Sequence, residues 1–81
     1  DGRVVPKSDE KAVQWYRRAA QQGFALGQAS LGWMYYAGRG VEASGTEALK
    51  WYIKAGEQGY DQARDMANEV SRELFGLPYF D

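Results

Sequence analysis

The apolar residues of the chain follow helical spacing in four runs, and short glycine-containing segments separate these runs. In the first run they recur every three or four positions, at Ala12, Trp15, Tyr16, Ala19 and Ala20. This spacing places them on one face of an α-helix, because the helix has about 3.6 residues per turn. The pattern therefore predicts an all-α chain.

The first predicted helix spans residues 9–22. Ser8 is expected to be its N-cap, because a serine hydroxyl accepts a hydrogen bond from a free N–H group of the first turn. Asp9 and Glu10 place negative charge in that turn, where the helix dipole favours it. Gly23 is expected to end the helix in a left-handed conformation.

The second predicted helix spans residues 26–37 and stops at the Gly-Arg-Gly segment 38–40. Its expected core face comprises Ala29, Leu31, Gly32, Met34 and Tyr35, with Trp33 and Tyr36 on the flanks. A glycine inside a helix destabilises it by about 1 kcal/mol relative to alanine. Gly32 therefore indicates that a neighbouring helix packs closely against this position.

The third predicted helix spans residues 45–58 and ends at Gly59. Ser44 and Glu47 match the capping box, in which each side chain bonds to the backbone N–H group of the other residue. This pair of residues predicts that the helix starts directly after Ser44.

The fourth helix is predicted to begin near Asp61. Its apolar face comprises Ala63, Met66, Ala67, Val70 and Leu74. The rest of its surface is polar, which a terminal repeat needs in order to stay soluble, so we interpret it as a C-terminal capping helix. The tail 76–81 is apolar and contains the helix breakers Gly76 and Pro78, and we expect it to fold back onto the core.

The chain repeats itself with a period of 36 residues. The identical pairs are Gly2 and Gly38, Arg3 and Arg39, Val5 and Val41, Ser8 and Ser44, Ala12 and Ala48, Trp15 and Trp51, Tyr16 and Tyr52, Ala19 and Ala55, Gln22 and Gln58, and Gly23 and Gly59. A fixed period of this size is typical of helical repeat proteins. We therefore predict one domain over 1–81, with repeats at about 8–43 and about 44–75 and a tail at 76–81.

Two blocks of this pattern resemble the Sel-one-like repeat, a relative of the tetratricopeptide repeat. The first block has the family spacing Ala-x-x-Trp-Tyr-x-x-Ala-Ala-x-x-Gly over residues 12–23, and residues 48–59 repeat most of it. The second block consists of Leu31-Gly32, Tyr35, Gly38, Gly40 and Val41, with Gly27 at the family's small position.

The resemblance covers residues 2 to about 74. It implies an α/α superhelix, which is a tetratricopeptide-like solenoid of two helix-turn-helix repeats with a C-terminal capping helix and tail. It also implies an adaptor or scaffold that binds proteins, as family members do in bacterial signalling and secretion and in eukaryotic quality-control complexes. Cysteine-rich members have been linked to β-lactam hydrolysis, but this chain has no cysteine, so that activity does not carry over.

The composition excludes several classes of chemistry. The chain has neither cysteine nor histidine, which removes disulfides, Cys/His zinc sites and histidine acid–base catalysis. The net charge of −1 gives no basic surplus for nucleic acid or an anionic membrane, and no apolar run approaches the roughly 18 residues of a membrane span. We predict no catalytic residue, cofactor or metal, and a protein or peptide partner. The composition fits both the bacterial cytoplasm and the periplasm.

The Trp-Tyr pairs at 15–16 and 51–52 have two interpretations. Aromatic side chains can stack on bases or sugars. Their recurrence on the apolar helix face favours core packing instead. We therefore expect Trp15, Trp51 and Leu31 to be buried.

Two further groups of residues have a structural interpretation that we favour. Asp61, Asp65 and Glu69 form an acidic column, but the edge of a straight helix does not wrap a cation with six or more oxygen ligands. The glycine-rich segment 38–40 follows a helix, whereas a phosphate-binding loop follows a strand. We interpret the first as a solvated face and the second as a turn.

The strongest functional signal is a difference between the repeats. Three positions on one flank of the first and third predicted helices change while the scaffold positions do not: Val13 becomes Leu49, Arg17 becomes Ile53 and Gln21 becomes Glu57. Leu49 and Ile53 are apolar where the helix turns toward solvent. These six residues are our candidate protein-binding positions, on a surface that would dock a peptide or a helix. The alternative for the flank is that Leu49 and Ile53 pack against the second predicted helix or the tail.

A second function remains open, which is a purely structural spacer within a longer solenoid. Residues 1–5 match the inter-repeat segment 37–41, so we expect another helix to precede the first one in such an array. An uncovered first helix would also favour self-association through the N-terminal end.

Overall fold

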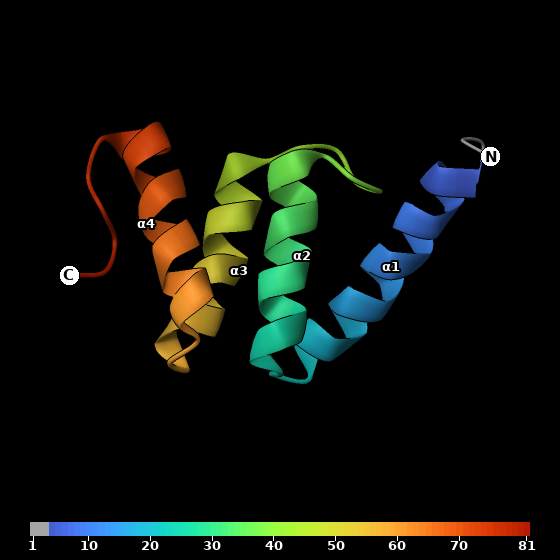
Figure 1. The fold of residues 1–81 in the computed structure, drawn as a ribbon, viewed down its shortest axis with the longest axis horizontal. Coiled ribbons are helices and arrows are strands. Elements are labelled where there is room, and N and C mark those ends of the chain that lie inside the picture. Colours follow the sequence, from blue (N-terminus) through green and yellow to red (C-terminus); the bar gives the residue numbers. More distant parts are fainter. Residues whose placement is uncertain (1–3) are drawn as a thin grey trace.

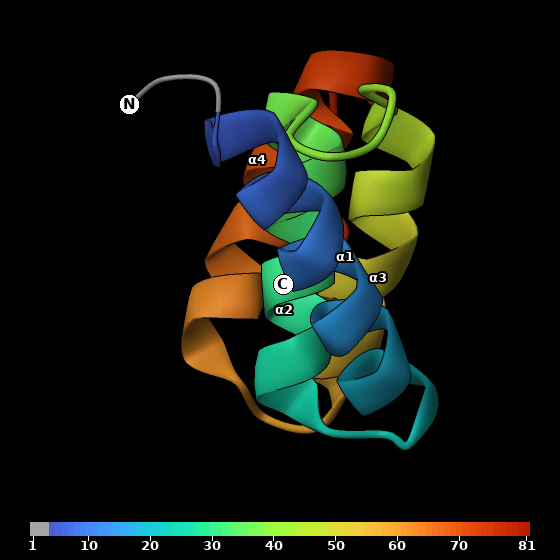
Figure 2. The same cartoon turned by 90° about the vertical axis from the view of Figure 1, so that its right-hand side faces the viewer.

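The computed structural model describes the backbone of residues 4–81 and the side chains of residues 8–81. Within this range the chain forms four helices, α1 (Val4–Gln21), α2 (Ala25–Ala37), α3 (Gly45–Glu57) and α4 (Asp61–Phe75). Figure 1 shows them as a row in which each helix packs against the next one along the chain. Along the row, α3 lies to one side of α2 and the start of α4 to the other (Figure 2). The predicted all-α architecture is confirmed.

The first helix begins earlier than the sequence predicts. It starts at Val4, so Ser8 lies inside the helix with an exposed side chain, and the prediction that Ser8 is the N-cap is wrong. The reason is the position of Pro6. Proline is compatible with the first helical turn, because the N–H group that it lacks has no partner within the helix there.

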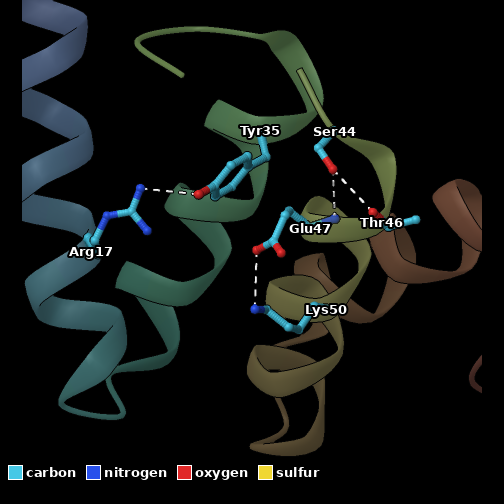
Figure 3. A network of polar contacts seen from close by, with 6 residues as sticks. All are labelled: Arg17, Tyr35, Ser44, Thr46, Glu47 and Lys50. Atoms are coloured by element: carbon cyan, nitrogen blue, oxygen red, sulfur yellow. Dashed lines mark hydrogen bonds and ion pairs between the residues drawn. The ribbon is translucent and has the colours of Figure 1, made fainter. Parts of the chain in front are cut away.

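Ser44 caps α3 as predicted. Its hydroxyl accepts a hydrogen bond from the N–H group of Glu47 at 3.2 Å (Figure 3). The reciprocal half of the predicted capping box does not form. The N–H group of Ser44 donates to the carbonyl oxygen of Tyr35 at 3.0 Å, and the Glu47 carboxylate lies 3.2 Å from the Lys50 ammonium group. The box is therefore replaced by one cap and one ion pair.

The Gly-Arg-Gly segment is a structural turn that holds the inter-repeat loop against α1. Gly38 ends α2 in the left-handed conformation, with φ of 70°. Gly40 also has a positive φ, and a Cβ atom there would lie 2.5 Å from the carbonyl oxygen of Asp9. Between them, Arg39 donates two hydrogen bonds to the Asp9 carboxylate, at 2.7 and 3.0 Å.

The core consists of two clusters, one in each repeat. The first joins α1 and α2 through Val13, Ala20, Leu31 and Met34. The second joins α3 and α4 through Ala48, Leu49, Tyr52, Ala55, Ala63, Ala67 and Val70. Tyr35 packs against both clusters, so the repeats share one continuous interior. Leu31 is fully buried, as predicted.

Gly32 permits the close approach of α3 to α2 that the sequence predicts. A Cβ atom at this position would lie 3.1 Å from ring carbons of Tyr52 and 3.3 Å from the carbonyl oxygen of Ala48. These separations are too short for a comfortable contact between heavy atoms, which have their optimum at about 3.5–4.0 Å. The absence of a side chain at Gly32 therefore makes room for the ring of Tyr52.

The two tryptophans of the repeat differ, and the prediction that Trp15 is buried is wrong. Trp15 is 67% exposed. Trp51 is partly buried, because it packs against the α1–α2 cluster of the preceding repeat. The two residues occupy the same face of equivalent helices. Within residues 8–81, however, no helix pair precedes α1 to cover Trp15.

The C-terminal tail folds back onto the core, where Phe80 is its packed side chain. Gly76 ends α4, and the Asn68 side-chain oxygen accepts hydrogen bonds from the N–H groups of Tyr79 (3.0 Å) and Phe80 (2.6 Å). Phe80 packs against the α3–α4 cluster, whereas Leu77 and Tyr79 stay exposed. The tail is therefore attached, but most of its apolar surface remains in contact with solvent.

Tyr52 carries the most unusual polar group of the core. Its side chain is 2% exposed, and its hydroxyl finds no hydrogen-bond partner among the described residues. Burial, followed by the nearby Tyr36 and Glu69, raises the pKa of Tyr52 to about 12. A buried hydroxyl without a partner destabilises a fold by about 1–3 kcal/mol.

The tryptophan pair provides a matched test of the core. We expect Trp51→Ala to lower the free energy of unfolding by about 2–4 kcal/mol, because a partly buried aromatic side chain leaves a cavity at the repeat interface. Trp15→Ala should change it by less than about 0.5 kcal/mol, as exposed substitutions do. Urea unfolding of both variants measures the difference, and equal losses would contradict the assignment of the core.

Alkaline pH should destabilise the protein through Tyr52. Its pKa is about 12 in the folded state against an ordinary 10.0, so its contribution to stability is present below about pH 10 and is lost as the pH rises through about 12. Melting temperatures of the parent should therefore fall more steeply over this range than those of Tyr52→Phe. Parallel curves for the two proteins would show that Tyr52 ionises freely.

Candidate protein-interaction surface

A groove runs along the outer face of α3, beside the last residue of α4. Its volume is about 450 Å³. Its walls come from two helices and comprise Thr46, Leu49, Lys50, Ile53, Lys54, Glu57 and Phe75. Six of these residues belong to α3 at helical spacing, so one face of this helix forms most of the groove.

The floor and one wall of the groove are apolar. Leu49 is nearly buried at the base, Ile53 is partly buried one turn further along, and Phe75 is 67% exposed. Phe75 is brought to α3 by the antiparallel packing of α4, in which Leu74 reaches the first residue of α3, Gly45. The groove therefore offers a continuous apolar surface to solvent.

The edges of the groove carry charge. Lys50 and Lys54 lie one turn apart, with their ammonium groups 5.3 and 6.0 Å from the ring centre of Trp51. Glu57 closes the far end. Two cations against one carboxylate give the groove a net positive charge, although Lys50 is also paired with Glu47.

Polar contacts hold both ends of α3 in place. Its start is fixed by the Ser44 cap. Beyond its end, the Gln58 amide donates to the carbonyl oxygen of Gly23 at 2.8 Å and to the side-chain oxygen of Gln28 at 3.0 Å. Gln28 is buried and donates in turn to the carbonyl oxygen of Ala20 at 3.3 Å. The face that forms the groove is therefore fixed relative to the first repeat.

The six predicted binding residues separate into two groups. Leu49, Ile53 and Glu57 line the groove together. Their counterparts on α1 do not: Val13 is 5% exposed and lies in the core. Arg17 donates a hydrogen bond to the Tyr35 hydroxyl at 3.1 Å (Figure 3), and Gln21 is exposed at the end of the helix.

The sequence prediction missed four residues of the groove. Thr46, Lys50 and Lys54 lie on the same helical strip as the predicted residues, so helical spacing alone would have indicated them. Phe75 had no such signal. Its place in the groove depends on how α4 packs on α3, which the spacing within one helix does not determine.

The aromatic and acidic residues that the sequence analysis considered as possible ligand sites do not form such sites. Tyr52 lies in the α3–α4 cluster of the core, and Tyr16 and Trp51 pack against the α1–α2 cluster. The packing interpretation is therefore confirmed for three of the four aromatic residues. Within residues 8–81 no three acidic side chains come together as a metal site would require. In the same part of the chain, no helix has the length and apolar character needed to cross a membrane.

Comparison with known families identifies the repeat. The model of the Sel1 repeat matches residues 1–24 and 25–60, and no enzyme family was found. The second match contains α2, the inter-repeat loop and α3, so its boundaries differ in phase from the predicted repeats at about 8–43 and about 44–75. A search of curated proteins gave no match. Because the two matched segments cover well over half of the sequence, the chain belongs to the Sel1 repeat family.

Proposed function

We propose that this chain is a non-catalytic adaptor that binds a peptide or helix of another protein in the α3 groove. Sel1 repeats generally mediate protein interactions, which supports the class of function. The observation that carries the finer proposal is an apolar groove in which exposed Phe75 of α4 and partly buried Ile53 of α3 flank the nearly buried side chain of Leu49. The lysines on the edge favour a segment that combines an apolar anchor with an acidic group.

A comparison of the two repeats supports this assignment. In the first repeat, Arg17 occupies the position of Ile53 and bonds to Tyr35 of the following helix. In the second repeat, Ser71 replaces Tyr35 and donates to the carbonyl oxygen of Leu77 at 2.6 Å instead. Ile53 therefore has no such partner and contributes an apolar surface to the groove.

The substitution Ile53→Arg tests the groove, because the equivalent position of the first repeat already carries arginine. Random short peptides displayed on phage would be selected on the parent chain and measured by fluorescence anisotropy. We expect their affinity to fall about tenfold or more in the variant, because a charge would then occupy the apolar floor. Ile53 is partly buried, so circular dichroism melts of the variant would verify that it folds.

Gln21→Arg, an exposed change on α1, is the matched control and should leave the affinity unchanged. Selected peptides that bind Ile53→Arg as tightly as the parent would contradict the proposal. A selection that yields no binding peptide would do the same.

The spacer function is favoured at one end of the chain and opposed at the other. Phe80 covers Gly56 and Arg64, with its ring centre 4.3 Å from the Arg64 guanidinium group. Ala20 and Gln28, the equivalent residues of the first repeat, lie where Trp51 and Gln58 of the next repeat attach. The tail thus covers part of the surface to which a following repeat would bind, which opposes the spacer function at that end. Exposed Trp15 at the opposite end favours it, because a preceding repeat would cover this side chain.

The open end at Trp15 should make the chain self-associate. Sedimentation equilibrium over a wide concentration range should show a reversible dimer, because covering Trp15 removes apolar surface from water. Trp15→Lys should shift the equilibrium to the monomer, whereas Leu77→Lys, at an equally exposed apolar position of the tail, should not. A parent chain that stays monomeric at every concentration would exclude association through this end.

A further inference from the structure

Helix α2 exposes apolar surface on the side away from α3. It contains no charged residue, and its exposed residues include Leu26 (64%) and Trp33 (45%). A surface helix normally places polar and charged residues on its outer face, and a helix that is apolar all round is normally covered. Contiguous apolar surface of this kind marks an interaction site.

This surface forms one wall of a second groove, between α2 and α4. The groove has a volume of about 230 Å³. Its lining is mostly apolar and comprises Leu26, Ala29, Ser30, Trp33, Tyr52, Tyr60, Gln62, Ala63 and Met66. Small-molecule sites are commonly about 300–1,000 Å³, so this groove is better suited to a side chain of a partner than to a separate ligand.

Tyr52 of α3 also belongs to the lining of this groove. Its side chain is 98% buried, as its 2% exposure shows, and its hydroxyl is closed off from solvent. Tyr52 therefore contributes to the base of the groove, and its hydroxyl is not in reach of a bound segment.

The groove becomes acidic toward the end of α4. Glu69 and Glu73 follow Met66 on the same helical face, and both are exposed. The Tyr36 hydroxyl donates to Glu73 at 3.0 Å, and Glu69 lies close enough to Tyr52 to raise its pKa. Arg39 lies over Trp33 of α2, and its charge is paired with Asp9. Helix α2 itself offers nothing to neutralise the two glutamates.

We propose that the α2–α4 groove binds a short basic segment of a partner protein. One apolar side chain of the segment packs between Trp33 and Met66. An arginine or lysine beyond this anchor pairs with Glu69. This site lies on a different face from the α3 groove, takes a partner of opposite charge, and does not depend on the function proposed for α3.

The test uses the Ile53→Arg chain as the bait, so that peptides bound to the α3 groove are not recovered. Random short peptides would be selected on it, and the recovered peptides are expected to combine a large apolar residue with arginine or lysine. Their affinity, measured by fluorescence anisotropy, should fall about tenfold with either Leu26→Ser or Glu69→Gln. It should also fall with added salt, because the ion pair is exposed. Both positions are exposed, and circular dichroism melts would verify that the variants fold.

Matched controls change the same residue types on other faces. Leu77→Ser and Glu57→Gln should leave the affinity within about twofold of the bait, as surface changes outside a site do. Tyr52→Phe should also leave the affinity unchanged, because the Tyr52 hydroxyl is buried beneath the groove. No enrichment of peptides, enrichment without basic residues, or affinity unaffected by Glu69→Gln would each overturn the proposal.

Discussion

The close approach of α3 to α2 at Gly32 is the contact on which the other features depend. Because Gly32 has no side chain, the ring of Tyr52 passes beside it and reaches the groove between α2 and α4. The same approach lets Trp51 pack against the first repeat while Leu49 and Ile53 line the groove on the other flank of α3. One small residue therefore sets the orientation of α3, and that orientation creates both grooves.

The two terminal faces of the helix row differ in how far they are covered. A helical repeat buries its open face against the next repeat, so a terminal face stays uncovered unless another segment closes it. At the C-terminal end, Phe80 packs onto Gly56 and Arg64 and is anchored through Asn68. At the other end, Trp15 stays in solvent, with only the Arg18 guanidinium group over its ring at 5.8 Å.

The sequence predicted the features that are determined by residues close to each other in the chain or by the size of a single residue. The Ser44 cap, the ends of the helices at glycine and the close contact at Gly32 follow from hydrogen bonding and from the size of one residue. The start of α1 was missed because Pro6 is compatible with both a loop and a first turn. Trp15 was misplaced because the repeat determines which way a side chain faces, but burial depends on whether a neighbour is present.

The candidate site shows the same division. Leu49, Ile53 and Glu57 differ from their counterparts in the first repeat, and their helical spacing places them on one strip of α3. These two signals together identified them from the sequence. Phe75 and the whole α2–α4 groove escaped because they arise where two helices meet, and the packing of α4 on α3 fixes them. The sequence places Trp33 on the flank of α2, but the spacing within this helix does not show which element lies beside it.

The net charge of −1 conceals two surfaces of opposite sign. Lys50 and Lys54 border the α3 groove, and Glu69 and Glu73 border the end of the α2–α4 groove. Charge at the rim of an interface acts mainly on partner choice and association rate, and apolar anchors supply most of the affinity. The two grooves have similar apolar linings, so their rims are what would direct an acidic segment to one and a basic segment to the other. Under the two proposals, the module holds two partners of opposite charge in two separate grooves.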